Sequence, residues 1–469
     1  MRAALVVLLL AATPAWTPAW GQAPRATGPG MVALPLPAGT RVLSLEEAER
    51  LLLERNLAVV AAQRGVDAVR AQRLVASSLP PPNVSVGNTV GEFRETRNNG
   101  IQGARLRGPN SNVQVGLTVL IETGGKRTLR TRLAEENIGV AEAQVLDALR
   151  GQFFVLRQGF IAALGARANL EVAWANRGSL DRTEALLRRQ VADGALPEGD
   201  LLRFQASRVV FEADIASAAQ TYAAAVAQVA VALALDAAAF GPASSLVRQA
   251  ALPPVALDVR GRFDAMPTPG VTRDELAEAV QNRADIVAAT RLAAAGAANT
   301  SLAEAQRSRD ISLNAGWART QLSQDRPDSA QPLIANNQFG FNLSIPIFTQ
   351  QIVRGNIGTA AGQQAQLEAQ ARAALLQGRA DFAVAWANYE QSRALLRLYT
   401  GGALSRAELA YRSAEQAYLA GGRSLLDVLD ALRTLNATRV AANNARVAYL
   451  TALAQLEAAT GVAGIAARL

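Results

Sequence analysis

The sequence predicts a mainly helical protein that also carries membrane β-strands and is built from two similar halves. One pattern of elements occurs twice at a shift of about 227 residues, so that Gly194 in the first copy corresponds to Gly421 in the second. Each copy contains two runs of about ten residues in which apolar and polar side chains alternate, a length that fits a tilted strand crossing a bilayer. Each also contains a helical pattern too long for a globular domain, since the proline-free stretch 127–193 would extend about 100 Å.

The N-terminal residues 1–21 have the features of a secretory signal peptide. Arg2 supplies a positive charge, an apolar run follows, and Ala19 and Gly21 are the small residues of a cleavage site. The chain contains no cysteine, so the exported protein is expected to have neither a disulfide nor a thiol for a lipid anchor. Residues 22–42 are rich in proline and glycine and predict an irregular leader.

The first repeat is expected to span residues 43–240. It opens with a helix, because Ser44 fits an N-cap and Glu47 follows it three residues later. Three consecutive prolines from Pro80 end this helical pattern. A hairpin with a long polar loop, the long helix, a glycine turn and a returning helix follow, with strands expected at 83–93 and 113–121 and the turn at 193–199.

The second repeat, residues 271–461, follows the same order. Its expected elements are strands at 310–320 and 338–348, a second long helix at 353–420 and a turn at 420–424. The proline-rich residues 241–270 form the predicted linker between the repeats, and residues 462–469 form a C-terminal tail.

Four strands cannot close a barrel around a pore, and lipid does not tolerate an open sheet edge. Several copies of the chain would therefore pool their strands, although alternation alone leaves open which face meets lipid. The alternative is a soluble four-stranded sheet packed on helices, because alternation is a weak signal for a single strand. Residues 215–235 are apolar enough to suggest a transmembrane helix, but their polar interruptions and alanine content favour a helix buried in a bundle.

Charge and chemistry exclude several classes of function. The formal net charge of +8 comes largely from arginines spread along helices, whereas a nucleic-acid surface would gather them into a patch. The chain has no histidine and no cysteine, which removes the commonest general base, nucleophiles and most transition-metal ligands. We expect no catalysis, no cofactor and no bound metal.

The two glycine turns carry the specific charged residues. Gly194 and Gly421 each lie between helices and fit the positive-φ position of a tight turn. Beyond the second turn, Arg423, Asp427 and Asp430 are spaced to share one helix face. The alternative is that these charges only solvate the first turns of a helix, where acidic residues are favoured.

Four segments of the chain resemble the TolC family of outer-membrane efflux and secretion ducts. YLAGGRSLLDVLDA from Tyr418 and ADGALPEGDLL from Ala192 are similar to the two periplasmic turns of that family. The strand-to-helix segments LTVLIETGGKRTLR and LSIPIFTQQIVRGNI are most similar to the CzcC branch, the outer-membrane partners of metal-exporting resistance-nodulation-division pumps. The resemblance covers nearly all of the chain after the signal peptide.

The resemblance implies a homotrimer in the outer membrane, in which each copy gives four strands to a twelve-stranded β-barrel continued by a helical tunnel across the periplasm. It implies a periplasmic gate in which Tyr418 bonds Asp200 within one copy and Arg423 reaches Asp200 of the next. The threonine that the family often has before that aspartate is Gly199 here, so its side-chain hydrogen bond is lost.

The resemblance also implies that the two turns dock a periplasmic adaptor protein, through Gly194, Ala195, Leu196, Gly421 and Gly422. Three-fold symmetry would place Asp427 and Asp430 as two acidic rings at the pore entrance.

The expected function is a passive exit duct that takes small molecules or metal cations from an adaptor and an inner-membrane pump. One alternative is the outer-membrane duct of a type I protein secretion system. An alternative of another class is a periplasmic coiled-coil adaptor, which would have a lipoyl-like β-domain and one helical hairpin.

Overall fold

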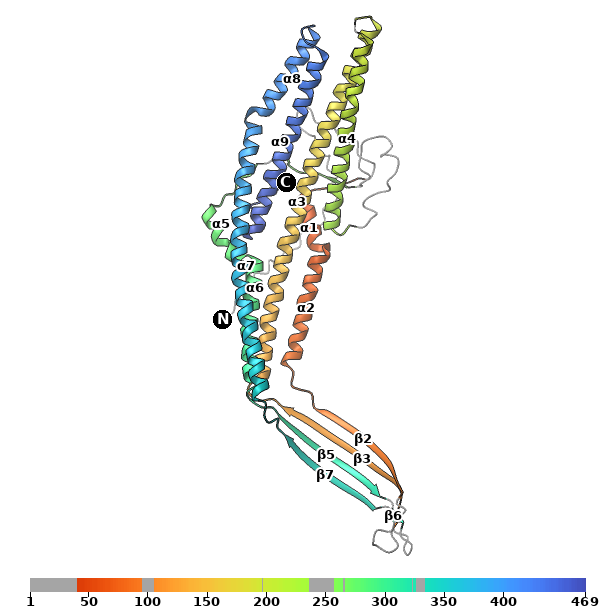
Figure 1. The fold of residues 1–469 in the computed structure, drawn as a ribbon, viewed down its shortest axis with the longest axis vertical. Coiled ribbons are helices and arrows are strands. Elements are labelled where there is room, and N and C mark those ends of the chain that lie inside the picture. The colour runs from red at the N-terminus through yellow and green to blue at the C-terminus, as the bar shows by residue number, and fades with distance from the viewer. Residues whose placement is uncertain are drawn as a thin grey trace, which may run out of the picture.

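One helix of 67 residues, α3 (Lys126–Ala192), runs along most of the molecule. The computed structural model describes residues 40–94, 105–195, 197–235, 257–264, 266–322, 324–325 and 334–469. Figure 1 shows a rod in which long helices lie side by side and a sheet extends from one end. The signal peptide, most of the leader and Leu196 lie outside the described residues.

The first repeat contains four helices and two long strands. Its elements are α1 (Leu45–Arg55), α2 (Leu57–Ser77), β2 (Asn83–Arg94), β3 (Arg105–Ile121), α3, and α4 (Glu198–Ala232). In the half of the rod near the sheet α2 packs on α3, and in the other half α4 takes that place.

The second repeat has the same order with one interruption. Its elements are α5 (Arg273–Ala279), a short 3₁₀ turn (Val280–Asn282), α6 (Ala284–Ala305), β5 (Ile311–Leu322), β6 (Gln324–Asp325), β7 (Ile334–Ser344), α7 (Gln350–Leu398), a π-turn (Tyr399–Ala403), α8 (Leu404–Leu419) and α9 (Leu425–Thr460). Its helices α6 and α9 pack against α3, so the two repeats form one body.

Equivalent residues of the two repeats make equivalent contacts. Asn56 is the N-cap of α2, and its Nδ2 donates to the carbonyl of Ala232 at 2.8 Å. Arg283 is the N-cap residue of α6, and its Nη1 donates to the carbonyl of Ala459 at 3.4 Å. Asn56 and Arg283 are separated by the same number of residues as Gly194 and Gly421, and so are Ala232 and Ala459. The repeat in the sequence is therefore also a repeat of contacts.

The sheet is antiparallel in the order β2-β3-β5-β7, so its two central strands come from different repeats. The predicted hairpins are present, but β3 begins at Arg105 rather than at residue 113. The strand expected at 338–348 is wrong at both ends, because β7 spans Ile334–Ser344. β7 ends there since β5, its partner, begins only at Ile311, and Pro346 follows with no N–H to donate.

The second long helix is not continuous, contrary to the expectation for 353–420. A π-turn separates α7 from α8, and Gly402 within it has φ 121°, outside the helical region. The apolar pattern runs on through both sides of the break, which is why the sequence suggested one helix. A π-turn accommodates one extra residue in a wider turn, so the helices on either side of it can present the same face to their neighbours. Such turns are found where long helices bend.

A small parallel sheet joins two segments that the sequence analysis treated as irregular. β1 (Arg41–Leu43) begins in the last residues of the predicted leader, and β4 (Leu257–Val259) lies inside the predicted linker. Asp258, the middle residue of β4, is fully buried and accepts hydrogen bonds from Tyr222 Oη at 2.6 Å and Arg260 Nε at 2.7 Å. Composition could not reveal this pairing, because the two strands lie far apart in the chain.

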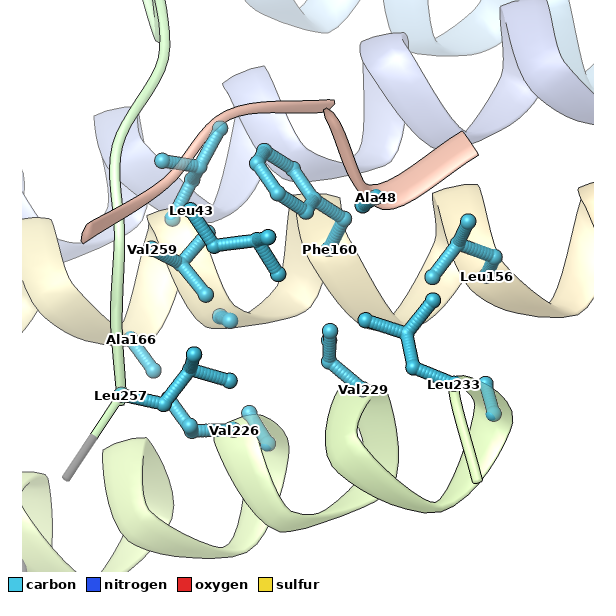
Figure 2. Packing of buried hydrophobic residues seen from close by; sticks show 14 of the residues in the cluster. Leu43, Ala48, Leu156, Phe160, Ala166, Val226, Val229, Leu233, Leu257 and Val259 are labelled. Carbon is cyan, nitrogen blue, oxygen red and sulfur yellow. The ribbon is translucent and has the colours of Figure 1, made fainter. Parts of the chain in front are cut away.

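The core beside this sheet lies where the first repeat's helices meet. Figure 2 shows Leu43 and Val259 of the small sheet in one cluster with Phe160 of α3 and Val229 of α4. Among the described residues, α4 is the one helix long and apolar enough to cross a membrane, yet 44% of its most apolar window is buried. Its apolar side chains therefore pack in the bundle, as the alanine-rich composition of residues 215–235 predicts.

Candidate functional site

The four-stranded sheet has one apolar face. Two-residue alternation and the pairing register place its side chains in continuous cross-strand rows, such as Val86–Val115–Trp317–Phe339. The apolar residues of this face are Val84, Val86 and Val90 of β2, Val113, Val115, Leu117, Val119 and Ile121 of β3, Ile311, Leu313, Ala315 and Trp317 of β5, and Phe339, Phe341 and Leu343 of β7. Toward the end of the sheet far from the helices the same face becomes polar, as in the row Asn88–Val113–Arg319–Asn337. Phe339 and Phe341 are 78% and 83% exposed, so no described segment of the chain covers them.

The opposite face is polar. Its rows carry amides, hydroxyls and glycines, as in Asn83–Thr118–Asn314–Asn342 and Ser85–Gly116–Gly316–Gly340. Thr118 Oγ1 donates to Asn314 Oδ1 at 2.7 Å across the strands. Only the apolar face fits contact with lipid, and the polar face fits a water-filled lumen. The register therefore decides a question that alternation within single strands left open.

A polar latch at the end of β3 holds the two repeats together where the strands meet the helices. Lys126, the only lysine in the sequence, donates from Nζ to Asp310 Oδ1 at 2.8 Å and to the carbonyl of Ser308 at 2.7 Å. The backbone N–H of Thr123 donates to the same carboxylate oxygen at 3.0 Å. No local pattern in the sequence marks these residues as partners, and only the β3–β5 register brings them together.

The first glycine turn joins α3 to α4 at the end of the rod far from the sheet. Gly194 has φ 71° as expected, and Ala195 beside it is exposed. Gly199 and Asp200 lie in the first turn of α4, and Asp200 Oδ1 is 3.6 Å from Nη1 of Arg203 on the same helix. This exposed pair orients Asp200 only weakly.

The second glycine turn joins α8 to α9 at the same end of the rod (Figure 1). Gly421 has φ 76°, and Gly422 follows it. Arg423 lies before the helix, because Ser424 is the N-cap of α9. The expectation that Arg423 shares a helix face with Asp427 and Asp430 is therefore wrong.

Asp427 has a structural partner at this turn. Its backbone N–H donates to Ser424 Oγ at 3.3 Å, and its carboxylate accepts from the Ser424 N–H at 3.2 Å, which makes a capping box. Asp430 is exposed and has no ion-pair partner in the described part of the chain. No group of three His, Cys, Asp or Glu side chains there is close enough to hold a metal ion.

The two hairpins pack against each other near these turns. Phe204 of α4 and Leu187 of α3 share a cluster with Leu429 and Leu432 of α9, and Tyr418 packs against it. Burial raises the pKa of Tyr418, and the negative charge of Asp200 raises it further. The two groups are therefore near one another, although Tyr418 donates no hydrogen bond to Asp200 among the described residues.

The hairpin of the first repeat is tied more firmly than that of the second. Arg208 of α4 binds both Glu184 and Asp181 of α3, and Glu184 is 6% exposed. Between α8 and α9, the described residues form the partly exposed ion pair Arg439–Glu408, with 2.9 Å between Nη2 and Oε1. The less firmly tied hairpin is also the one preceded by the π-turn.

Comparison with known proteins identifies relatives along the whole body. The family model described as outer membrane efflux protein matches residues 50–236 and 276–462. The chain is similar to the cobalt-zinc-cadmium resistance protein CzcC of Cupriavidus metallidurans, with 26% identity over 447 residues that cover 94% of each protein.

Solved structures of outer-membrane channels share the fold. CusC superimposes with a TM-score of 0.69 at 18% identity, over 94% of this chain and 98% of that one. The CmeC outer membrane channel of Campylobacter jejuni gives a TM-score of 0.67 at 16% identity, over 89% of this chain and 85% of that one.

Proposed function

The chain belongs to the outer membrane efflux protein family, and we propose that three copies of it form one duct for metal cations or small molecules. It is a TolC-like outer-membrane efflux duct that extends into the periplasm and is not an enzyme. A periplasmic adaptor does not fit, because the chain has two helical hairpins and a membrane-type sheet in place of a lipoyl-like domain.

The observation that carries the proposal is the open two-faced sheet. β2 and β7 are its edges and have no second strand partner in the described part of the chain. An apolar face requires lipid, and lipid does not tolerate unpaired edges. Four strands from each of three copies would close a twelve-stranded barrel whose lumen carries the amide and hydroxyl rows.

We propose a periplasmic adaptor and an inner-membrane pump of the resistance-nodulation-division type as partners. The chain has no nucleotide-binding motif, so a partner must supply the energy for transport. Our candidates for the adaptor contact are the exposed turn residues Gly194, Ala195, Gly421 and Gly422, together with Leu196, which lies outside the described residues. The CzcC relative is a cobalt-zinc-cadmium resistance protein, which favours divalent cations as the cargo of this duct.

The susceptibility of a deletion strain tests this assignment. We expect selective sensitivity to divalent cations, restored by a plasmid copy of the gene. Sensitivity to dyes and detergents alone would make small organic molecules the cargo. Loss of a secreted protein without either change would make the chain a type I secretion duct. Native mass spectrometry of the detergent-solubilised protein tests the trimer separately.

Tyr418, Arg423 and Asp200 are our proposed gate at the periplasmic end. Arg423 is exposed in the single chain and free to reach Asp200 of a neighbouring copy. Each exposed contact is worth only about 0.2–1 kcal/mol, but three symmetric copies act on one aperture. We expect Arg423→Ser with Tyr418→Phe to raise single-channel conductance in planar bilayers.

Arg412→Ser is the matched control for the gate. Arg412 is an exposed arginine on α8 of the same hairpin, away from the turn. Its replacement should leave conductance unchanged. Equal conductance of the gate double variant and the wild type would place the closure elsewhere, for example at the π-turn.

Asp427 and Asp430 are our proposed acidic rings. Six carboxylates around a narrow opening would focus a negative potential that attracts cations despite the basic total charge. We expect Asp427→Asn with Asp430→Asn to weaken block by a trivalent cation about tenfold and to reduce cation selectivity. Asparagine at 427 keeps an oxygen for the capping box, so the helix start is preserved.

Asp193→Asn controls for a general loss of surface charge. Asp193 is an exposed acid at the other turn, just before Gly194. Block that weakens equally in this control and in the double variant would reduce Asp427 and Asp430 to ordinary surface acids.

A further inference from the structure

The two strand-to-helix junctions of the chain are built differently. After β3 the left-handed positions are Gly124 and Gly125, with φ 69° and 68°, and the polar latch of Lys126 and Asp310 closes the junction. After β7 the left-handed position is Phe348, with φ 59° and 87% exposure. The left-handed residues of the first junction are glycines that follow Glu122, the repeat equivalent of Phe348. The second junction instead has an uncovered aromatic ring at its left-handed position.

An aromatic residue with positive φ is strained, and glycine would take the position without that cost. Such strain persists where the surrounding structure compensates for it. Within the described part of the chain no contact compensates, because Phe348 and the preceding Ile347 are both exposed, at 87% and 63%. The compensating contact must then come from outside the chain.

The internal repeat indicates what lies there. Within one chain, the end of β3 pairs antiparallel with the start of β5, and Ile121 lies opposite Ile311. Residues 121–123 read IET and residues 347–349 read IFT, while 310–312 read DIS and 83–85 read NVS. The unpaired edges of β7 and β2 are thus the repeat equivalents of the paired edges of β3 and β5.

Transferring the internal register to the edge strands places Ile347 opposite Val84 of a second copy, and Ile345 opposite Val86. Val84 and Val86 lie on the apolar face, and Ile345 and Ile347 continue the alternation of Leu343 on that face. A register slip of one residue would set apolar residues against the polar face. The transferred register keeps both faces continuous across the seam.

At the helix side of this seam the polar latch has no counterpart. Asp310 and Lys126 correspond to Asn83 and Ile352, and Asn83 is preceded by Leu79 and three prolines. Leu79 is 68% exposed, and prolines have no N–H to extend the strand ladder. Both sides of the seam are therefore apolar where the strands end.

We propose that Phe348 of one copy packs on Leu79 and the adjacent prolines of a second copy, and that this apolar contact replaces the Lys126–Asp310 latch at the three seams between copies. The contact locks the barrel to the helical tunnel at the membrane surface. This inference rests on the trimer proposed above.

Disulfide cross-linking tests the seam, and the absence of native cysteine makes the background clean. Ile345→Cys with Val86→Cys should give covalent trimers on non-reducing gels, because paired strand residues are about 4.5–5.5 Å apart at Cα. Ile345→Cys with Val90→Cys is the matched control, since Val90 lies about 13 Å further along the strand. Cross-linking of the control pair alone would overturn the register.

The role of Phe348 has its own test. Phe348→Ala and Phe348→Gly should both lower the temperature at which the trimer dissociates in detergent, whereas Leu313→Ala, on the apolar face of the central strand β5, should not. If Phe348 only faced lipid, glycine would relieve its strain and leave or raise that temperature, which would overturn the contact. A monomer in native mass spectrometry would instead refute the trimer, and an intact trimer without either effect would refute only the seam.

Discussion

Replacing Leu343 by arginine is expected to abolish stable insertion of the protein into the outer membrane. Leu343 lies on the apolar face, opposite Leu313 and 60% exposed, one residue before the end of β7. An arginine on the lipid-facing side of a barrel costs up to about 2–4 kcal/mol per copy, with the cost falling from the bilayer midplane toward the interface, and three copies would carry the charge. The measurement is the amount of heat-modifiable trimer in the outer-membrane fraction.

Asn342→Arg is the control for this prediction. Asn342 immediately precedes Leu343 in β7, and its side chain lies on the polar face, opposite Asn314. Arginine there would point into water, so the trimer should still insert, with conductance shifted toward anions. If Asn342→Arg blocked insertion and Leu343→Arg did not, the assignment of the two faces would be reversed.

Alternation within each strand predicted that the strands are two-faced, but it could not say which face meets lipid. Each strand has two sides, and the polar side includes small residues such as Gly116 of β3 and Gly316 of β5. Such residues do not mark a side as either lipid-facing or water-facing. The decision needs all four strands in register, where the apolar rows become continuous. Pairing partners far apart in sequence fix that register, so it is a tertiary property.

The glycine turns were predictable because their cause is local. Gly194 and Gly421 adopt the positive φ that a tight turn between helices requires, and glycine adopts it at the least cost. The π-turn before α8 was missed although Gly401 and Gly402 mark it in the sequence. Glycine inside a helical pattern is often tolerated, so the break depends on packing that the sequence alone does not display.

Within the candidate site, the sequence predicted correctly only those contacts that form within a single helix terminus. Asp427 lies three residues after Ser424, which is the spacing of a capping box, and the structure gives it that role. The positions of Tyr418 and Asp200 near each other depend on the packing of α4 against the second hairpin, which the family resemblance supplied. The Lys126 latch had no local signal, because Asp310 belongs to the other repeat.

The sequence also contained no sign of the role of Arg283, whose side chain links helices α6, α7 and α9. Its guanidinium binds Asp285 through two hydrogen bonds of 2.7 Å and Asp381 of α7 at 3.0 Å. The side chain is 4% exposed. Burial lowers the pKa of Arg283, but the bonds to Asp285 and Asp381 outweigh it, so the net shift is upward and the charge is kept. A sequence pattern does not distinguish such an arginine from the exposed ones around it.

Arg283→Met is expected to destabilise the folded protein by about 3 kcal/mol, because removing one partner leaves buried charges uncompensated. The value lies at the low end of the usual range since Asp285 and Asp381 are 28% and 39% exposed and recover some hydration. Guanidinium unfolding of the trimer in detergent measures the loss. Arg379→Met, an exposed arginine beside Asp381 on α7, should change the midpoint little.

A double variant separates the charge from the packing. Asp285→Leu added to Arg283→Met removes one of the uncompensated acids, so the combined loss should be smaller than the sum of the two single losses. Asn56 occupies the equivalent place in the first repeat with an uncharged amide, which shows that the fold needs a donor there rather than a charge. Arg283→Gln should accordingly recover part of the lost stability, and a loss equal to that of Arg283→Met would mean that the ion pairs, and not the bond to Ala459, hold this junction.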